Sequence, residues 1–262
     1  MKLVTLLQAL LVFAVLWSVA AWLGGLPSLF EILGATGQMI QRGTYFHDVA
    51  ISLTRFGIGW LIGASLALPL GLFTGRLAKL AAPLEVNLHV FRAIPVIALV
   101  PLAVYWWGIG EAPKYFLVAW GVFFPVWLNV HNGARQVNQR YLHAAQSLGA
   151  TRWELSWRVV LPSVSYAALT GFRVAIGVGL ICVVAGELTG AYEQGFFSQG
   201  LGYRIQRAAD LNHLAEMLSC IFTFGAIGFI ADRLFTQVAR PAVLKALHFD
   251  PYRSHSRDGT HS

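Results

Sequence analysis

Long apolar runs separated by short polar stretches dominate this chain. Six of them are candidates for membrane-crossing helices, at about residues 3–25, 52–75, 90–108, 115–130, 167–188 and 215–231. A helix rises about 1.5 Å per residue and a bilayer core is roughly 30 Å thick, so about 20 residues are needed to cross it. The fourth run is shorter than this, and we expect Trp127 or Asn129 near its interface. The pattern predicts an all-α integral membrane protein.

The first apolar run has two interpretations. It follows Lys2, and Ala20 and Ala21 offer small residues for a signal-peptide cleavage site. The run is longer than the 7–15 apolar residues of a usual signal peptide, and further runs follow it. We therefore interpret it as the first transmembrane helix, joined to the second by a less apolar connection at 26–49.

Small residues recur inside two of the runs. Gly59 and Gly63 are four residues apart, as are Gly71 and Gly75, and the fifth run has a stripe of Gly171, Ala175 and Gly179. Such spacing lets helices approach closely in lipid. The third run holds Pro95 and Pro101, which are compatible either with a kinked helix along a watery path or with plain packing.

The longest interval between apolar runs, at about 135–162, predicts a helical hairpin. Its first helix covers about 139–148 and stops at Gly149, a residue that can adopt the left-handed conformation. Thr151 and Glu154 have the spacing of a capping box for the second helix. We expect Pro162 to end that helix.

The second helix of this hairpin also shows helical spacing. Glu154 and Arg158 are spaced for an i,i+4 ion pair. One face collects apolar residues, and its two tryptophans are expected to anchor the hairpin to its own core: Trp153, Trp157, Val160 and Leu161.

Composition supports a membrane protein. Hydrophobic residues make up 56% of the 262 residues and charged residues only 12%, with a mean hydropathy of +0.61. Soluble domains carry about 25% charged residues. A net charge of +7 could indicate binding to nucleic acid. The positions of the basic residues along the chain decide whether it does.

Six spans place both termini on one membrane side, and the basic residues indicate which. That side, with the connections 76–92 and 131–162, holds thirteen lysines and arginines against five on the other. By the positive-inside rule it faces the cytoplasm. Topology thus explains the charge, and no nucleic-acid partner is expected. Arg92 is counted on this inner side, and Arg55 is interpreted as snorkelling to the outer interface rather than contacting substrate.

Catalytic patterns are missing from the sequence. It contains no G-x-x-x-x-G-K-[ST] loop for ATP phosphates, no H-E-x-x-H and no G-x-S-x-G. The histidines are too scattered for a metal site, and Cys182 and Cys220 lie in apolar runs, as expected of packed thiols. We expect neither catalysis nor a cofactor on this chain. If ATP drives the process, another polypeptide must bind it.

Two charges fall inside the fifth run. Charge within a bilayer is expensive and marks a functional candidate. For Arg173 we favour snorkelling or a structural ion pair, the alternative being attraction of an anion along a path. Glu187 stabilises an outer gate or a docking surface, or else sits in water at the interface. The polar stretch 189–214 has no physical explanation at this point.

The hairpin sequence HAAQSLGATRWELSWRVVLP resembles the cytoplasmic coupling loop of ABC-importer permeases. Ala144, Ala145, Gly149, Leu161 and Pro162 match its pattern, and His143 stands where the family usually has Glu. The resemblance implies that the ATPase is contacted through His143, Ala144, Ala145, Gly149, Ala150, Leu161 and Pro162.

Further segments resemble the nitrate, sulfonate, taurine and bicarbonate branch of these permeases, over about residues 46–240. They include SLTRFGIGWLIGASLALPLGLFTGR, FRAIPVIALVPLAVYWWGIGEAPK, FFPVWLNVHNGARQV, GFRVAIGVGLICVVAGELTG and GLGYRI. The resemblance implies a type I importer fold with about six transmembrane helices. It makes 1–240 a single permease domain and 241–262 a basic cytoplasmic tail with a disordered end.

The resemblance also implies partners and a location. They are two cytoplasmic ATPase subunits carrying ATP and magnesium, an extracytoplasmic solute-binding protein, and a second permease copy in a homodimer. The location is the bacterial inner membrane, with both termini cytoplasmic. The substrate is expected to be a small oxyanion, with a pyrimidine precursor of thiamine as the alternative. A channel or secondary transporter would leave the capped hairpin without a purpose.

Overall fold

The computed structural model describes residues 2–151, 154–188, 199–239 and 241, and its regular structure there is entirely helical. Its α-helices are α1 (Lys2–Gly24), α2 (Leu29–Gln41), α3 (Thr44–Arg76), α4 (Ala78–Arg92), α5 (Val100–Trp107), α6 (Glu111–Arg135), α7 (Gln139–Ser147), α9 (Leu161–Leu188), α10 (Leu201–Asp210) and α11 (Leu214–Leu234). Shorter helical segments are η1 (Val96–Leu99), η2 (Leu155–Val160) and η4 (Phe235–Ala239). The predicted all-α class is confirmed. The predicted tail beyond 241 lies outside the described residues.

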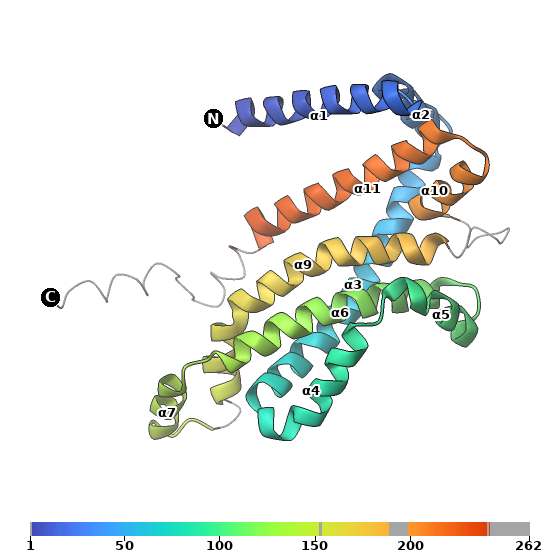
Figure 1. Ribbon diagram of the computed structural model, residues 1–262. Helices are drawn as coiled ribbons and strands as arrows, with labels where there is room; N and C mark the ends of the chain where they lie inside the picture. Colours follow the sequence, from blue (N-terminus) through green and yellow to red (C-terminus); the bar gives the residue numbers. More distant parts are fainter. Residues whose placement is uncertain (1, 152–153, 189–198, 240, 242–262) are drawn as a thin grey trace.

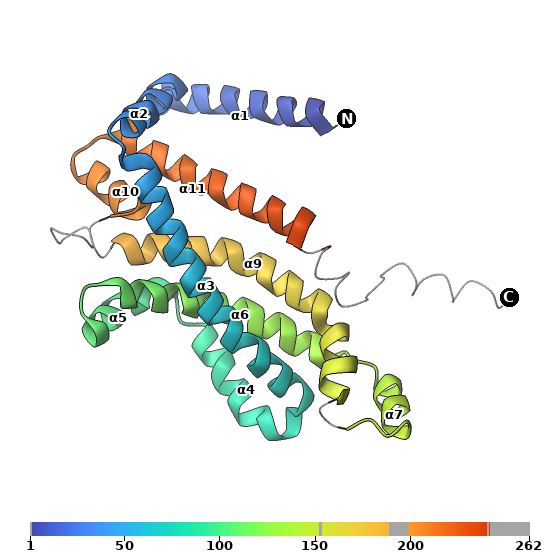
Figure 2. The same cartoon turned by 180° about the vertical axis from the view of Figure 1, so that it is seen from behind.

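Helix α6 forms the centre of the molecule. It packs against both α3 and α9, and the second half of α3 runs alongside α6 from Gly59 to Gly75 (Figures 1 and 2). Leu117, Val122 and Trp127 of α6 are completely buried. Cys182 and Cys220 are buried free thiols, as expected. The core therefore lies between α3, α6 and α9.

Small residues bring these helices together. A Cβ atom at Gly63 would lie 2.5 Å from the carbonyl oxygen of Ala119, and one at Gly75 would lie 2.5 Å from that of His131. On α9, a Cβ atom at Gly171 would lie 3.1 Å from the carbonyl oxygen of Pro125. Only glycine fits such close backbone approach, so the packing role predicted for these positions is confirmed.

The fourth span is longer than expected. Helix α6 has 25 residues, or about 38 Å at 1.5 Å per residue, which is enough to cross a bilayer. Trp127 was expected near an interface, but it is fully buried and donates a hydrogen bond from Nε1 to Thr74 Oγ1 at 3.1 Å. Because α3 covers this part of α6, the indole N–H of Trp127 finds its partner inside the protein.

The third span is bent rather than straight. Residues 76–91, expected to form a short connection, are mostly helix α4, and the chain then turns by 90° into η1 and α5. Pro95 lies at this turn, where its ring and missing N–H favour a break between helices. Arg92, the last residue of α4, therefore lies at the bend and not in a connection outside the membrane.

The N-terminal region is also bent. Helix α1 coincides with the first expected span, but the expected connection at 26–49 contains α2 and the start of α3. The capping box of Ser28 and Glu31 begins α2, with the Ser28 N–H donating to the Glu31 carboxylate at 2.7 Å. The angle between the two helices is 96°. A local cap in an apparently loop-like segment thus produced a helix that we did not predict.

The number of spans depends on how bent pairs are treated. Within the described residues, α3, α9 and the segment Leu214–Gln237 are long and apolar enough to cross a membrane individually. The pairs α1–α2 and α4–α5 bring the number to as many as five. Helix α6 is not among them, but it is long enough to span and lies between two helices that qualify. Each of the six expected spans therefore corresponds to a helix or a bent pair.

The two ends of the molecule differ. Helix α7 lies at one end, toward which the first turn of α1 and the last turn of α11 also point (Figure 1). Helices α2, α5 and α10 lie at the other end, together with the end of α9 (Figures 1 and 2).

Candidate functional site

The predicted hairpin begins with a well-capped helix. Asn138 precedes α7, and its Oδ1 accepts a hydrogen bond from the backbone N–H of Arg140 at 2.9 Å. At the other end, Gly149 has a φ of +85°. Its N–H donates to the carbonyl of Gln146 at 2.9 Å, and the N–H of Ala150 donates to that of Ala145 at 3.0 Å. These two bonds form a Schellman motif, so the predicted left-handed helix end is confirmed.

The second half of the hairpin is capped as predicted but does not end as predicted. The backbone N–H of Thr151 donates to Glu154 Oε2 at 3.0 Å, and the N–H of Glu154 donates to Thr151 Oγ1 at 3.3 Å. The π-helix η2 then continues directly into α9. Pro162, expected to end the helix, is instead the second residue of α9. Pro162 has no N–H to donate, and it directly follows a π-helical segment, whose hydrogen bonds reach five residues back instead of four.

Three side chains named for this hairpin lie outside the described part of the structure. They are Trp153, Trp157 and Arg158. The tryptophan anchors and the ion pair between Glu154 and Arg158 therefore stay predictions.

The hairpin has an anchored side and an exposed side. Leu142, Leu155 and Val160 are buried in the main core, and Ala145 and Ala150 pack against it. Leu161 and Pro162 are half-buried at the start of α9. In contrast, His143, Ala144 and Gly149 are exposed. The predicted contact residues thus divide between the two sides.

Two exposed apolar residues of the hairpin were missed. Tyr141 is 65% exposed and Leu148 is 89% exposed. They are seven residues apart with Ala144 between them, so they share one face of α7. This i, i+3, i+7 spacing, on a helix that Leu142 anchors from its other side, was the sequence signal that could have identified the exposed face. Such a face suits an apolar groove on another protein.

At the opposite end, Glu187 is the centre of a buried polar network. Ser52 donates to both of its carboxylate oxygens, at 2.8 and 2.9 Å. The backbone N–H of Gly202 donates to Oε2 at 2.7 Å. The side chain of Glu187 is 0% exposed, which excludes the interpretation that it sits in water.

Arg55 joins this network and was misinterpreted. Its Nε and Nη2 donate to the carboxylate of Glu111 at 2.7 and 2.5 Å, and its Nη1 donates to Glu187 Oε1 at 2.8 Å and to the carbonyl of Gln199 at 2.6 Å. The side chain is only 4% exposed. The expected snorkelling is wrong, because two carboxylates from α6 and α9 satisfy the guanidinium inside the protein. Lys114 Nζ contacts Glu111 at 3.0 Å and extends the network.

The network also fixes the start of α10. The N–H groups of Gly200 and Leu201 donate to Asp48 Oδ1 at 3.1 Å and to Ser52 Oγ at 3.0 Å. Arg204 of α10 pairs with Asp48 as well and lies 3.3 Å from Glu216. The segment GLGYRI, noted from the sequence only as a resemblance, is therefore the part of the chain that closes onto Asp48, Ser52 and Glu187.

Arg173 has a structural partner. Its Nε and Nη2 donate to the two carboxylate oxygens of Asp232 on α11, at 2.5 and 2.9 Å. The favoured interpretation of Arg173 as part of a structural ion pair is confirmed. Arg173 and Glu187 are not brought together, since Arg173 lies near the middle of α9, Glu187 lies at its end, and the two have different partners.

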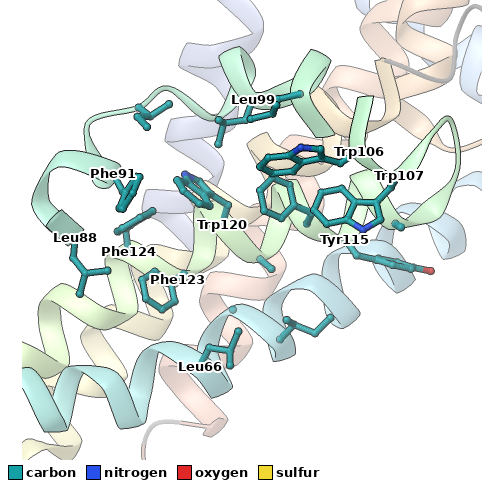
Figure 3. A pocket seen from close by; sticks show the side chains of 17 residues that line it. Leu66, Leu88, Phe91, Leu99, Trp106, Trp107, Tyr115, Trp120, Phe123 and Phe124 are labelled. Atoms are coloured by element: carbon teal, nitrogen blue, oxygen red, sulfur yellow. The ribbon is translucent and has the colours of Figure 1, made fainter. Parts of the chain in front are cut away.

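A large apolar groove lies between α3, α4, α5 and α6. Its volume is about 730 Å³, and Figure 3 shows the rings of Trp106, Trp107, Trp120 and Phe124 around it. Its lining is almost entirely carbon. Such a surface suits lipid tails or another apolar helix and offers no charge to an anion.

A smaller groove adjoins the first one, and Trp120 and Phe124 of α6 line both. Its volume is about 330 Å³, and it is bounded by the α4–η1 bend, α6 and α9. It contains Arg92 and Asn129 among mostly apolar neighbours. Arg92 was not predicted as a site residue, because the pattern of apolar runs placed this arginine in a connection outside the membrane.

Comparison with known proteins agrees with this arrangement. Residues 67–241 match the family described as binding-protein-dependent transport system inner membrane component. The putative aliphatic sulfonates transport permease protein SsuC of Bacillus subtilis is 30% identical over 239 residues, covering 89% of this chain and 84% of that protein. The taurine transport system permease protein TauC of Escherichia coli is 33% identical over 207 residues, covering 79% and 72%.

A solved structure has the same fold. The MetNI methionine ABC transporter, in inward-facing conformations, matches with a TM-score of 0.59 at 19% identity, covering 77% of this chain and 95% of the matched chain. The six-span, type I permease arrangement expected from the sequence is consistent with this match. The matched family spans more than half of the chain and includes the hairpin, α9, α10 and α11. The chain belongs to the family of binding-protein-dependent transport system inner membrane components and is a permease subunit of an ABC importer.

Proposed function

We propose that this permease forms the path for a small oxyanion, such as an alkanesulfonate, taurine, nitrate or bicarbonate. Relatives named for aliphatic sulfonates, taurine and bicarbonate support this substrate class. The family places the chain in an inner membrane and implies an ATPase and a solute-binding protein as partners. The proposal adds two ATPase subunits, which carry ATP and magnesium, and a second copy of the permease in a homodimer.

The observation that carries the coupling mechanism is the exposed face of the hairpin. Helix α7 is fixed to the core by Leu142 and presents Tyr141, Ala144 and Leu148 outward. An ATPase groove that receives this face moves α9 when the ATPase pair closes, because η2 joins the hairpin to α9 without a break. ATP-driven closure would thereby change the access of the path from the inner to the outer side.

The proposed orientation follows from the charges and the hairpin together. The hairpin end carries Arg135 and Arg140, and we place it in the cytoplasm with both termini. Moving Arg92 from an inner connection to the bend does not reverse the excess of basic residues at this end. The polar network around Glu187 then lies at the outer end, where it closes α10 against α3 and α9.

The first test is copurification. The tagged permease is expressed with the ATPase and the binding protein from the same source and purified in mild detergent, and ATPase activity is measured in the eluate. We expect the ATPase to copurify and reconstituted vesicles to take up taurine or ethanesulfonate only with ATP. A permease eluting alone, without ATPase activity, would contradict the proposed assembly.

A variant of Gly149 tests the coupling step itself. Gly149→Leu forces a branched side chain into a left-handed conformation at the exposed tip of the hairpin. We expect ATP hydrolysis to persist while uptake falls at least tenfold. Gly177→Leu is the matched control, since this glycine has open space around it on α9 and lies far from the hairpin in the chain. Normal coupled transport by the Gly149 variant would exclude this role for the hairpin.

A further inference from the structure

The smaller groove lies halfway along the core spans. It is lined by Gly121, Phe124 and Asn129, near the middle of α6, and by Val174 and Val178, near the middle of α9. The hairpin and the polar network lie at the two ends of these same helices. A residue in this groove therefore sits near the centre of the bilayer.

Among the described residues that line this groove, Arg92 is the only charged one. Its side chain is exposed, and within the described part of the chain it makes no ion pair or side-chain hydrogen bond. A charged residue at the centre of a bilayer is costly unless it faces a partner or a water-filled cavity. Since none of the described residues that line the groove is a carboxylate, the positive charge is open to a ligand.

Other arginines of the spans show what an ordinary structural role looks like. Arg55 binds Glu111 and Glu187, Arg173 binds Asp232, and Arg204 binds Asp48 and Glu216. Each of these has at least one carboxylate from a different helix. Arg92 differs from these three arginines because its side chain faces an open groove, whereas each of theirs faces a carboxylate.

The groove also matches a small anion in size and lining. Its 330 Å³ is near the lower limit of ligand pockets, which measure about 300–1,000 Å³. Arginine binds oxyanions through two parallel N–H bonds. The amide of Asn129 donates one hydrogen to the carbonyl of Pro125 at 2.8 Å and has a second hydrogen to offer. The apolar residues can receive a short carbon chain.

We propose that this groove binds the oxyanion substrate at the midpoint of the path, and that Arg92 pairs with its negatively charged group. The inference rests on the proposed function as an oxyanion importer and goes beyond it by naming the residue that selects for charge. The anion-attracting role considered for Arg173 is thus assigned to Arg92, because Arg173 forms an ion pair with Asp232.

The test uses the complete importer in proteoliposomes. ATP-dependent uptake of labelled taurine, ethanesulfonate, nitrate and bicarbonate is measured, and the anion taken up fastest by the unmodified importer becomes the probe. We expect Arg92→Gln to lower uptake of this probe at least tenfold at subsaturating concentration, with protein yield and the amount of copurified ATPase within twofold of the unmodified importer. Arg92→Lys should retain a third or more of the uptake, because it keeps the charge.

The matched control is Arg76→Gln. Arg76 lies in the last turn of α3, outside the groove, so its uptake should stay within twofold of the unmodified importer. A second readout does not depend on the glutamine variant. In Arg92→Cys, modification with the cationic reagent 2-aminoethyl methanethiosulfonate should restore uptake, whereas the neutral reagent methyl methanethiosulfonate should not.

The outcomes separate this inference from the proposed function. An unmodified importer that takes up an oxyanion, with Arg92→Gln equally active, would overturn the inference alone. Rescue of the cysteine variant by both reagents would also overturn it, because filling space rather than charge would then be sufficient. An unmodified importer that takes up none of the four anions would overturn the oxyanion proposal, and the inference with it.

Discussion

The hairpin and the polar network differ in how far apart in sequence their partners are. In the hairpin, the decisive hydrogen bonds join residues three to five positions apart, as between Thr151 and Glu154 or between Ala145 and Ala150. In the polar network, Arg55 and Glu187 are 132 positions apart, and Arg204 and Asp48 are 156 apart. The hairpin is therefore a local structure, whereas the network exists only when α3, α6, α9 and α10 are assembled.

The two regions also differ in exposure. The hairpin presents apolar residues outward, and Leu148 is 89% exposed. The network buries charge, with Glu187 and Arg55 almost fully covered. We infer that the hairpin serves contact with a partner, while the network holds together the end of the permease opposite the hairpin. This difference predicts opposite responses to substitution.

The largest expected effect on stability is from removing the cation at the centre of the network. Arg55→Gln leaves the buried carboxylate of Glu187 without its cation, and breaking a buried pair costs about 3–5 kcal/mol. We expect a strong loss of monodisperse protein and a lower apparent melting temperature in detergent. Arg140→Gln, which removes an exposed arginine of the hairpin, is the control and should leave both unchanged.

A double variant sharpens this prediction. If the pairing of charges is what matters, Arg55→Gln combined with Glu187→Gln should be less damaging than the sum of the single changes, because no unpaired charge is then buried at Glu187. An Arg55→Gln protein that elutes as a single peak with an unchanged melting temperature would show that the network does not hold this end of the permease together.

The second prediction compares two glycines, one in each region, and its expected effect on stability is smaller. Both have positive φ, +113° at Gly200 and +85° at Gly149. A Cβ atom at Gly200 would lie 2.5 Å from Glu187 Oε1 and 2.8 Å from Arg55 Nη1, while one at Gly149 meets nothing within 4 Å. The Glu187 carboxylate cannot easily move away, since Ser52, Arg55 and Gly202 hold it.

We therefore expect Gly149→Ala to lower the free energy of unfolding only by the backbone strain, about 1–2 kcal/mol. Gly200→Ala should cost at least about 1.5 kcal/mol more, the value of one hydrogen bond to a charged group. Apparent melting temperatures of the two purified variants measure the difference. If both variants lose the same amount of stability, the positive φ alone explains the need for glycine, and the close contact with Glu187 does not contribute.

The separation of contacting residues along the sequence also explains which features could be predicted from the sequence. The approximate positions of the spans, the small residues at the α3–α6 contact and both caps of the hairpin were predicted, because periodicity and short spacings encode them; the bends at α1–α2 and α4–α5 were not. Arg55 was misplaced because its carboxylates come from α6 and α9, and no local pattern pairs residue 55 with residue 187. Arg92 was misplaced because the 90° bend after α4 was not visible in an apolar run that continues through Pro95.

Pro162 shows the same limit at shorter range. Proline inside an amphipathic helix is an ordinary stop signal, and the prediction that the hairpin ends there followed from it. The structure changes the hydrogen-bond pattern to a π-helix just before the proline and continues into α9. This continuity was the most consequential feature missed at the hairpin, because it connects the exposed face mechanically to a core span.

The smallest expected effect on stability comes from the exposed residue Leu148. Leu148→Ser removes an apolar side chain that is 89% exposed, and such surface changes alter stability by no more than about 0.5 kcal/mol. We expect an unchanged melting temperature but clearly weaker retention of the ATPase during purification, with lower ATP-dependent uptake. Leu211→Ser is a matched control at the other end of the molecule, since Leu211 is 54% exposed after α10.

The two serine variants separate docking from folding. If Leu148→Ser loses the ATPase while Leu211→Ser keeps it, and both melt like the unmodified protein, the hairpin face binds the ATPase and contributes little to the fold. If both variants keep the ATPase equally well, the exposed face of α7 is not the docking surface. If Leu148→Ser melts early, the hairpin is part of the permease core after all, and the contrast with the polar network fails.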